Sequence, residues 1–225
     1  MQPGFQVLKR RHVVGKEWVD RFASIPVANI SDSMSRLNSG SAKLRPMHAG
    51  GVLCGPAVTV KSAPGDNLMT HMALNLAVEG DVVVVDAGGD LTNALIGERM
   101  LAYCIAKKFA GIVIYGAVRD SGWIRQRDFP VYACGITHQG PYKNGPGEIN
   151  TPISIGGMVV SPGDLMVGDE DGLICVPQAA VEALHAKAAA KFKHESDTFA
   201  AIGQGDNDAA GYRAKLTKLG CYFEA

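Results

Sequence analysis

The stretch GIVIYGAVRDSG, residues Gly111–Gly122, decides the fold because it joins an apolar segment directly to a polar turn. The apolar part predicts a β-strand that ends near Val118, and Arg119 and Asp120 follow it at once. Neighbouring side chains of a regular strand point to opposite faces, so this pair can serve one site only from the turn after the strand. Ser121 and Gly122 favour such a turn.

A second strand and a helix precede this stretch. The run VVVVD, which ends at Asp86, is typical of a strand covered on both faces. The Gly-rich segment Gly88–Gly97 predicts a loop, and GERMLAYCIAKKF predicts a helix that begins at Gly97. Residues 81–118 therefore predict a βαβ unit. Ligands of α/β sheets gather beyond the carboxyl ends of strands, where both this loop and the Arg119–Asp120 pair lie.

The rest of the chain reads as further strands and helices of an α/β protein. Met69, Met72, Ala73, Leu76 and Ala77 recur at helical spacing and predict one buried helix face. Other expected elements are a helix at Lys16–Ala23, strands at Val52–Lys61 and at VYACGI (131–136), a small antiparallel β layer over 151–177, and a helix from Gln178 to about Ala201.

Composition limits the classes of function. The chain of 225 residues fits a single domain, with segments 1–25 and 180–225 packing on the core or on a neighbouring subunit. Its 22 basic and 22 acidic residues give zero formal charge, which argues against nucleic-acid binding. The opening segment has no apolar region typical of a secretory signal. Nowhere do about 18 apolar residues run uninterrupted, which argues against a membrane-spanning helix. Five scattered cysteines indicate reduced thiols and a cytoplasmic protein.

Three features around the predicted βαβ unit could carry chemistry. The helix start at Gly97–Met100 presents unpaired N–H groups that suit a carboxylate or phosphate, unless it is an ordinary helix start. Arg119 could clamp a carboxylate or stabilise an oxyanion, or it could form a structural ion pair. Asp120 could bind Mg²⁺ or Mn²⁺, or it could cap a helix over residues 121–127.

Other polar groups give weaker signals. Asp169, Glu170 and Asp171 resemble a metal cluster, but DEDG between two predicted strands is more simply a turn. The six histidines show no HxH or HExxH spacing, which argues against zinc, and His138 in a Gly-rich loop is the one that merits attention. The Gly-rich loops match neither the GK[ST] motif of phosphate-binding loops nor the GxGxxG motif of dinucleotide binding. The GxSxG motif of a nucleophilic serine is also not present.

The chain resembles a known family through an ordered set of segments that spans roughly residues 28–180. It is similar to the class II pyruvate aldolases that act on 4-hydroxy-4-methyl-2-oxoglutarate and 4-carboxy-4-hydroxy-2-oxoadipate, and to the related RraA-like regulators of ribonuclease E activity. The segments are ISDSMSRL, CGPAVTV, PGDNLMTHMAL, GDVVVVDAGG, GERMLA, GIVIYGAVRDS and SPGDLMVGDEDGLICVP. The resemblance implies a compact, layered α/β fold of the swivelling ββα type. It also implies a homotrimer or homohexamer with sites at subunit boundaries.

The same resemblance implies a set of site residues. Gly97, Glu98, Arg99 and Met100 would form the substrate-binding helix start, Arg119 would contact the pyruvyl group as the catalytic arginine, and Asp120 would hold Mg²⁺ or Mn²⁺. The family pattern has an acidic residue three positions after the aspartate, where this chain has Trp123. An acidic residue from a neighbouring subunit's C-terminal region is also implied, for which Glu195 is the candidate.

The implied activity is that of a metal-dependent carbon–carbon lyase. Such an enzyme cleaves a 4-hydroxy-2-oxo dicarboxylic or tricarboxylic acid to pyruvate and a carbonyl product, and it could also decarboxylate oxaloacetate. Asp120 favours this reading, because the regulator branch does not require the aspartate. The alternative is a non-catalytic ring that binds and regulates a protein partner such as a ribonuclease.

Overall fold

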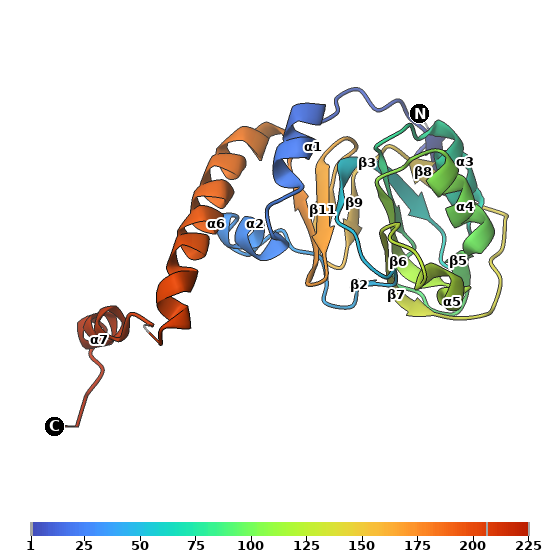
Figure 1. The fold of residues 1–225 in the computed structure, drawn as a ribbon. Helices are drawn as coiled ribbons and strands as arrows, with labels where there is room; N and C mark the ends of the chain where they lie inside the picture. The colour runs from blue at the N-terminus through green and yellow to red at the C-terminus, as the bar shows by residue number, and fades with distance from the viewer. Residues whose placement is uncertain (1, 206, 225) are drawn as a thin grey trace.

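The strand β6 (Gly111–Val118) lies in the middle of the main sheet, between β4 (Val82–Asp86) and β7 (Val131–Ile136). The computed structural model describes residues 2–205 and 207–224, and it gives the strand order β1-β8-β3-β4-β6-β7-β2 (Figure 1). β3 (Leu53–Ser62), β4, β6 and β7 run parallel. Every residue of β4 is buried, as its unbroken apolar run predicts for a strand covered on both faces.

Short strands complete this sheet. β8 is antiparallel to β3, β1 is parallel to β8, and β2 is antiparallel to β7. β5 pairs in parallel with β6 and lies within the segment that the sequence predicts to be a loop. The bounds are Phe5–Val7 for β1, Arg45–Pro46 for β2, Ala94–Ile96 for β5 and Gly147–Ile149 for β8.

Helices α3 (Leu68–Leu76) and α4 (Glu98–Ala106) lie on one side of the sheet, and the short α5 (Ser121–Ile124) lies near the ends of β6 and β7 (Figure 1). The buried face of α3 is narrower than predicted. Met69 and Ala73 are buried, whereas Met72 and Leu76 are each 42% exposed. The sheet-facing stripe therefore repeats every four residues, and the positions beside it face solvent.

The other face of the sheet packs against two β-hairpins. β9 (Ile153–Ile155) pairs with β10 (Met158–Val160), and β11 (Leu165–Asp169) pairs with β12 (Gly172–Val176), both antiparallel as predicted. The first half of β3 pairs with β11 and its second half with β4, so β3 links the two layers. The DEDG segment forms the turn between β11 and β12.

An outer helical layer covers the β11–β12 hairpin. Phe22, Ile30 and Val181 are buried between these helices and the hairpin. α6 then runs away from the body, and α7 lies beyond its far end (Figure 1). The helices are α1 (Lys16–Phe22), α2 (Val27–Ser33), the 3₁₀ turn Gln178–Ala180, α6 (Val181–Gly203) and α7 (Ala209–Lys218). The layered α/β fold predicted from the sequence is confirmed.

Two further observations concern the whole described chain. Within residues 2–205 and 207–224, none of the helices has both the length and the apolar composition that a membrane crossing requires. The five cysteines are free thiols, as their scattered positions in the sequence indicate.

Candidate functional site

The site begins where β5 and β6 end side by side. Ile96 pairs with Val118 in the parallel ladder, and the N–H of Arg119 donates a 3.0 Å hydrogen bond to the carbonyl oxygen of Ile96. The residues that follow the two strands, Gly97 and Arg119, are therefore neighbours although they are far apart in sequence. The prediction that the strand ends at Val118 and that the pair lies in the next turn is confirmed.

Asp120 caps a helix, but not the helix predicted from its position. Its φ of 59° is in the left-handed region, which Asp tolerates better than most residues. Its side chain makes no capping bond to α5, which ends at Ile124 instead of residue 127. The Oδ2 atom instead accepts a 2.9 Å hydrogen bond from the backbone N–H of Glu98, the first residue of α4. This bond joins the turn after β6 to the start of α4.

Gly97 makes this close approach possible. A Cβ atom at this position would overlap the Oδ2 atom of Asp120 and lie 2.9 Å from Cγ and 3.0 Å from Nε of Arg119. The φ of Gly97 is −147°, an extended value that any residue can adopt. Glycine is therefore required here for space and not for backbone freedom.

Arg119 forms only a long ion pair with its neighbour. Its Nε atom lies 3.8 Å from Oδ2 of Asp120, and its side chain is 43% exposed. Neither Nη atom has a hydrogen-bond partner among the described residues. The planar end of the guanidinium group is thus free to bind a carboxylate or a developing oxyanion.

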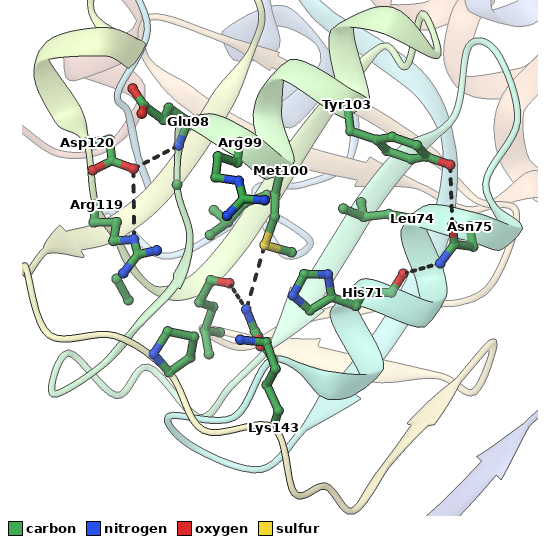
Figure 2. Close-up of a pocket in the computed structure, with 16 residues that line it drawn as sticks. His71, Leu74, Asn75, Glu98, Arg99, Met100, Tyr103, Arg119, Asp120 and Lys143 are labelled. Atoms are coloured by element: carbon green, nitrogen blue, oxygen red, sulfur yellow. Dashed lines mark hydrogen bonds and ion pairs between the residues drawn. The ribbon is translucent and has the colours of Figure 1, made fainter.

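These groups line a pocket of about 620 Å³ between α3, α4 and the loop that contains Lys143 (Figure 2). The pocket brings together six of the site residues that the sequence predicts, namely Gly97, Glu98, Arg99, Met100, Arg119 and Asp120. At the helix start, the N–H of Glu98 is bound to Asp120 and that of Met100 donates to the carbonyl oxygen of Gly97. The N–H of Arg99 has no acceptor among the described residues, so it remains available to an anion.

The opposite wall contains polar residues that the sequence reading missed. Asn67, His71 and Asn75 line the pocket from the start and body of α3, together with Tyr103 from α4 and Lys143 from the loop. Asn67, His71 and Asn75 are spaced four residues apart, and residues at this spacing share one helix face. This spacing was the signal in the sequence that could have identified them. The sequence reading attended instead to the apolar stripe on the same helix.

The electrostatic environment favours a neutral His71. Partial burial lowers its pKa, because it removes water from the charged form, and the positive charge of Lys143 lowers it further. Neither ring nitrogen of His71 has a hydrogen-bond partner in the part of the chain that the structure describes. A neutral imidazole facing a pocket can donate one hydrogen bond and accept another.

Asp120 offers one carboxylate oxygen to which a hard cation such as Mg²⁺ or Mn²⁺ could bind. The Oδ1 atom of Asp120 has no hydrogen-bond partner among the described residues, and the side chain is 36% exposed. No group of three or more His, Cys, Asp or Glu suited to a metal occurs within those residues. Mg²⁺ accepts one or two carboxylates and keeps several waters, so a single carboxylate is compatible with such an ion.

Several other candidates lie outside this pocket. The ring of Trp123 stacks against Arg127, whose guanidinium carbon lies 3.4 Å from the ring centroid. Glu195, on α6, accepts a hydrogen bond from Asn29 and pairs with Lys191 at 2.9 Å. His138 and the Asp169–Asp171 turn do not line the pocket.

Comparison with known proteins identifies relatives over most of the chain. The family model described as RraA-like, Aldolase/RraA, matches residues 27–175. A Halalkalibacterium halodurans protein provisionally named a 4-hydroxy-4-methyl-2-oxoglutarate aldolase is 37% identical over 90% of this chain and 95% of its own. A Thermus thermophilus protein with that aldolase name, not provisional, is 35% identical over 50% of this chain and 69% of its own.

Solved structures give a second kind of relative. The structure of the RNA-processing inhibitor RraA from Thermus thermophilus superimposes with a TM-score of 0.62 and 29% sequence identity. The match covers 68% of this chain and 92% of that protein. Relatives of this chain are thus named both for a lyase activity and for inhibition of RNA processing.

Proposed function

Because this chain belongs to the aldolase/RraA family, we propose that it is a divalent-metal-dependent carbon–carbon lyase. Its substrate is a 4-hydroxy-2-oxo acid with two or three carboxylates, and its products are pyruvate and a second carbonyl compound. Decarboxylation of oxaloacetate is included in the proposal, because it also leaves negative charge on a 2-oxo acid. The aldolase names of the two relatives support the reaction class.

The observation that carries the proposal is the arrangement of Arg119, Asp120 and the N-terminus of α4 on one wall of the pocket. A free guanidinium fork, a carboxylate with one unused oxygen and a free helix N–H converge there. These are the groups needed to hold a 2-oxo acid and to stabilise negative charge on its oxygen.

The roles of the residues follow from their positions. The N–H of Arg99 and the positive end of the α4 dipole would hold the substrate's C1 carboxylate. Arg119 would donate hydrogen bonds to the 2-oxo oxygen and stabilise its charge as the carbon–carbon bond breaks. Asp120 would bind the metal, which supplies a Lewis acid for that oxygen when bound. Gly97 keeps the two side chains against the helix start.

The proposal is tested by following pyruvate release from 4-hydroxy-4-methyl-2-oxoglutarate and from oxaloacetate, with Mg²⁺ and with a chelator. We expect Mg²⁺-dependent release by the wild type and loss of at least about 100-fold in Asp120→Ala. Asp20→Ala is the matched control, because Asp20 is an exposed carboxylate of α1 outside the pocket. Equally negligible rates for wild type and Asp120→Ala would refute the enzyme proposal.

A second candidate function is supported by the likeness to the RNA-processing inhibitor from Thermus thermophilus. In this alternative, the chain is a non-catalytic ring that binds and regulates a protein partner such as a ribonuclease. Its expected signature is capture of a ribonuclease without any need for Mg²⁺, together with no lyase activity.

We also propose that the chain assembles as a homotrimer or homohexamer. The support is a set of large apolar side chains that are exposed on α6, on α7 and just after α7. They are Phe199, Ile202, Tyr212, Leu216 and Leu219. These elements lie away from the body of the chain (Figure 1), and a neighbouring subunit that covers them would bury apolar surface. Light scattering that gives a monomer mass would refute this assembly.

A further inference from the structure

A single loop contacts both walls of the pocket and is fixed at both of its ends. Residues 139–145, called the strap from here on, lie between β7 and β8. Pro141 and Lys143 of the strap line the pocket, and Figure 2 shows the loop that carries Lys143 running along it. Tyr142 makes two backbone hydrogen bonds to the segment before α3, and the other end of the strap bonds to the start of β5. The strap therefore ties the two walls together.

Asp66 holds the end of the strap that lies near α3. It is 3% exposed, and its Oδ2 atom accepts hydrogen bonds from the N–H groups of Asn144 and Gly145 at 2.5 and 3.0 Å. Its Oδ1 atom accepts a 2.9 Å hydrogen bond from the N–H of Leu68, the first residue of α3. Hydrogen bonds to a carboxylate are stronger than those between neutral groups, so this one buried side chain joins the strap firmly to the helix.

Asn93 holds the other end of the strap. It is 5% exposed, and its Nδ2 atom donates a 2.6 Å hydrogen bond to the carbonyl oxygen of Gly140. The N–H of Ala94 donates a 2.8 Å hydrogen bond to the carbonyl oxygen of Gln139. Neither Asp66 nor Asn93 lines the pocket, so each can affect a bound ligand only through the groups that it holds in place.

The bond from Asn93 places Gly140 against the guanidinium group of Arg119. A Cβ atom at Gly140 would lie 3.3 Å from Nη1 of Arg119, so the backbone of the strap packs against the end of this side chain. A long side chain that is 43% exposed loses rotamer freedom when a fixed backbone lies beside its end. The strap therefore reduces the number of positions that the guanidinium group can take.

We propose that Asp66 and Asn93 are positioning residues, which hold the strap against Arg119 and so fix the guanidinium group for reaction. The strap moves as one unit, and loss of either anchor releases it. A displacement of about 1 Å is enough to weaken a group that must meet a developing charge. The effect on catalysis rests on the proposed function of Arg119, whereas the strap and its two anchors do not.

The strap is tested by digestion of the full chain with trypsin, which cleaves after Lys and Arg. Lys143 is the only residue of either type in the strap, so cleavage after Lys143 reports on the strap. The N–H of the bond to be cleaved belongs to Asn144, which Asp66 binds. Cleavage requires this segment to open, and we expect it to be at least about tenfold faster in Asp66→Ala and in Asn93→Ala than in the wild type.

Two controls separate opening of the strap from unfolding of the whole chain. Cleavage after Lys61, in the central strand β3, requires the sheet to unfold and gives a reference rate in the same digest. Asp90→Ala is the matched control, because the Asp90 carboxylate accepts hydrogen bonds from Thr92 in its own turn. It should keep the wild-type rate of cleavage after Lys143. A rate after Lys143 that does not rise relative to that after Lys61, or that rises in one variant only, would overturn the strap.

The positioning of Arg119 is tested by combining Asn93→Ala with Arg119→Lys. Lysine keeps the positive charge but has no Nη1 atom for Gly140 to contact. With Arg119 present, we expect Asn93→Ala to lower the kcat of pyruvate release from oxaloacetate about tenfold and to change KM by less than about twofold. With Arg119→Lys, the same substitution should change kcat by less than about twofold, because its effect passes through the arginine. An equal tenfold loss in both backgrounds would overturn the positioning role.

This inference and the proposed function fail in distinguishable ways. A wild type that releases no pyruvate refutes the proposed function, and the digest still decides whether the strap is held at both ends. A strap that opens in both variants while kcat stays at the wild-type value overturns the positioning role alone.

Discussion

The backbone N–H of Glu98 donates a 2.9 Å hydrogen bond to Oδ2 of Asp120, which links the start of α4 to the turn after β6. Because β5 and β6 end at the same edge, this single bond aligns the helix N-terminus with the arginine and the carboxylate. The bond occupies one carboxylate oxygen, and the other, Oδ1, has no hydrogen-bond partner among the described residues. Capping and metal binding are therefore compatible roles for Asp120.

Gly97→Ala tests this alignment. The added methyl group would overlap Oδ2 of Asp120 and press on Arg119, so we expect both side chains to move and the rate to fall about 100-fold. Gly122→Ala is the matched control, because its Cβ meets no atom within 4 Å and lies in α5. It should leave pyruvate release unchanged and stabilise the fold slightly. Full activity in Gly97→Ala would contradict the packing argument.

Trp123→Ala separates structure from catalysis at the position where the family pattern has an acid. Trp123 packs against the main core and under Arg127, which also donates a 2.6 Å hydrogen bond to its carbonyl oxygen. We expect the free energy of unfolding to fall by on the order of 2 kcal/mol. The kcat/KM of the folded fraction should stay within about twofold. A large loss of kcat/KM without a change in stability would place Trp123 in the substrate site.

A buried ion pair ties the N-terminal segment to the sheet. Arg10 binds Asp81 with two 2.8 Å hydrogen bonds, and the two side chains are 14% and 1% exposed. Arg10→Met leaves the Asp81 carboxylate buried without its cation, which should cost about 3–5 kcal/mol in urea unfolding. Lys16→Met, which breaks the exposed pair with Asp20, should leave the midpoint unchanged. If the two variants lost equal amounts of unfolding free energy, burial of the Arg10–Asp81 pair would not explain its contribution to stability.

The lowered pKa of His71 predicts how stability depends on pH. Its usual pKa is 6.5, and partial burial and Lys143 lower it in the folded chain. Between these two values the unfolded chain binds a proton that the folded chain does not, so stability must fall as pH drops below about 6.5. Above that pH, His71 is neutral in both the folded and the unfolded chain, so it adds no pH dependence to the free energy of unfolding. Urea melts from pH 7.5 to 5 measure this for the wild type and for His71→Gln. The free energy of unfolding should fall less with decreasing pH in the variant than in the wild type.

The sequence predicted the elements near the centre of the chain because each had one dominant local signal. The run that ends at Val118 is one example, and its end was confirmed. The helix predicted from Gly97 is another, and it begins one residue later, at Glu98, with Gly97 as its N-cap. β5 was missed because Ala94–Ile96 is short and follows a Gly-rich turn. Its strand conformation comes from pairing with β6, a tertiary contact that no local pattern contains.

The site could be predicted only in part for a similar reason. Arg119 and Asp120 stood out as adjacent charges at a strand end, but the partner of the Asp120 carboxylate is on a helix start 22 residues away in sequence. The left-handed backbone at Asp120 turns the chain so that its side chain meets α4 instead of α5. Asn67 and His71 gave no signal of their own beyond a shared helix face.

The central claim is that Arg119, together with a divalent metal held by Asp120, would stabilise negative charge on the oxygen of a 2-oxo acid. It is tested most directly by proton NMR of pyruvate in D₂O, where loss of the methyl signal reports deprotonation next to that oxygen. We predict Mg²⁺-dependent loss of this signal with the wild type and none above background with Asp120→Asn, which keeps the side-chain shape. The same exchange rate for both proteins, or exchange that does not depend on Mg²⁺, would contradict the account.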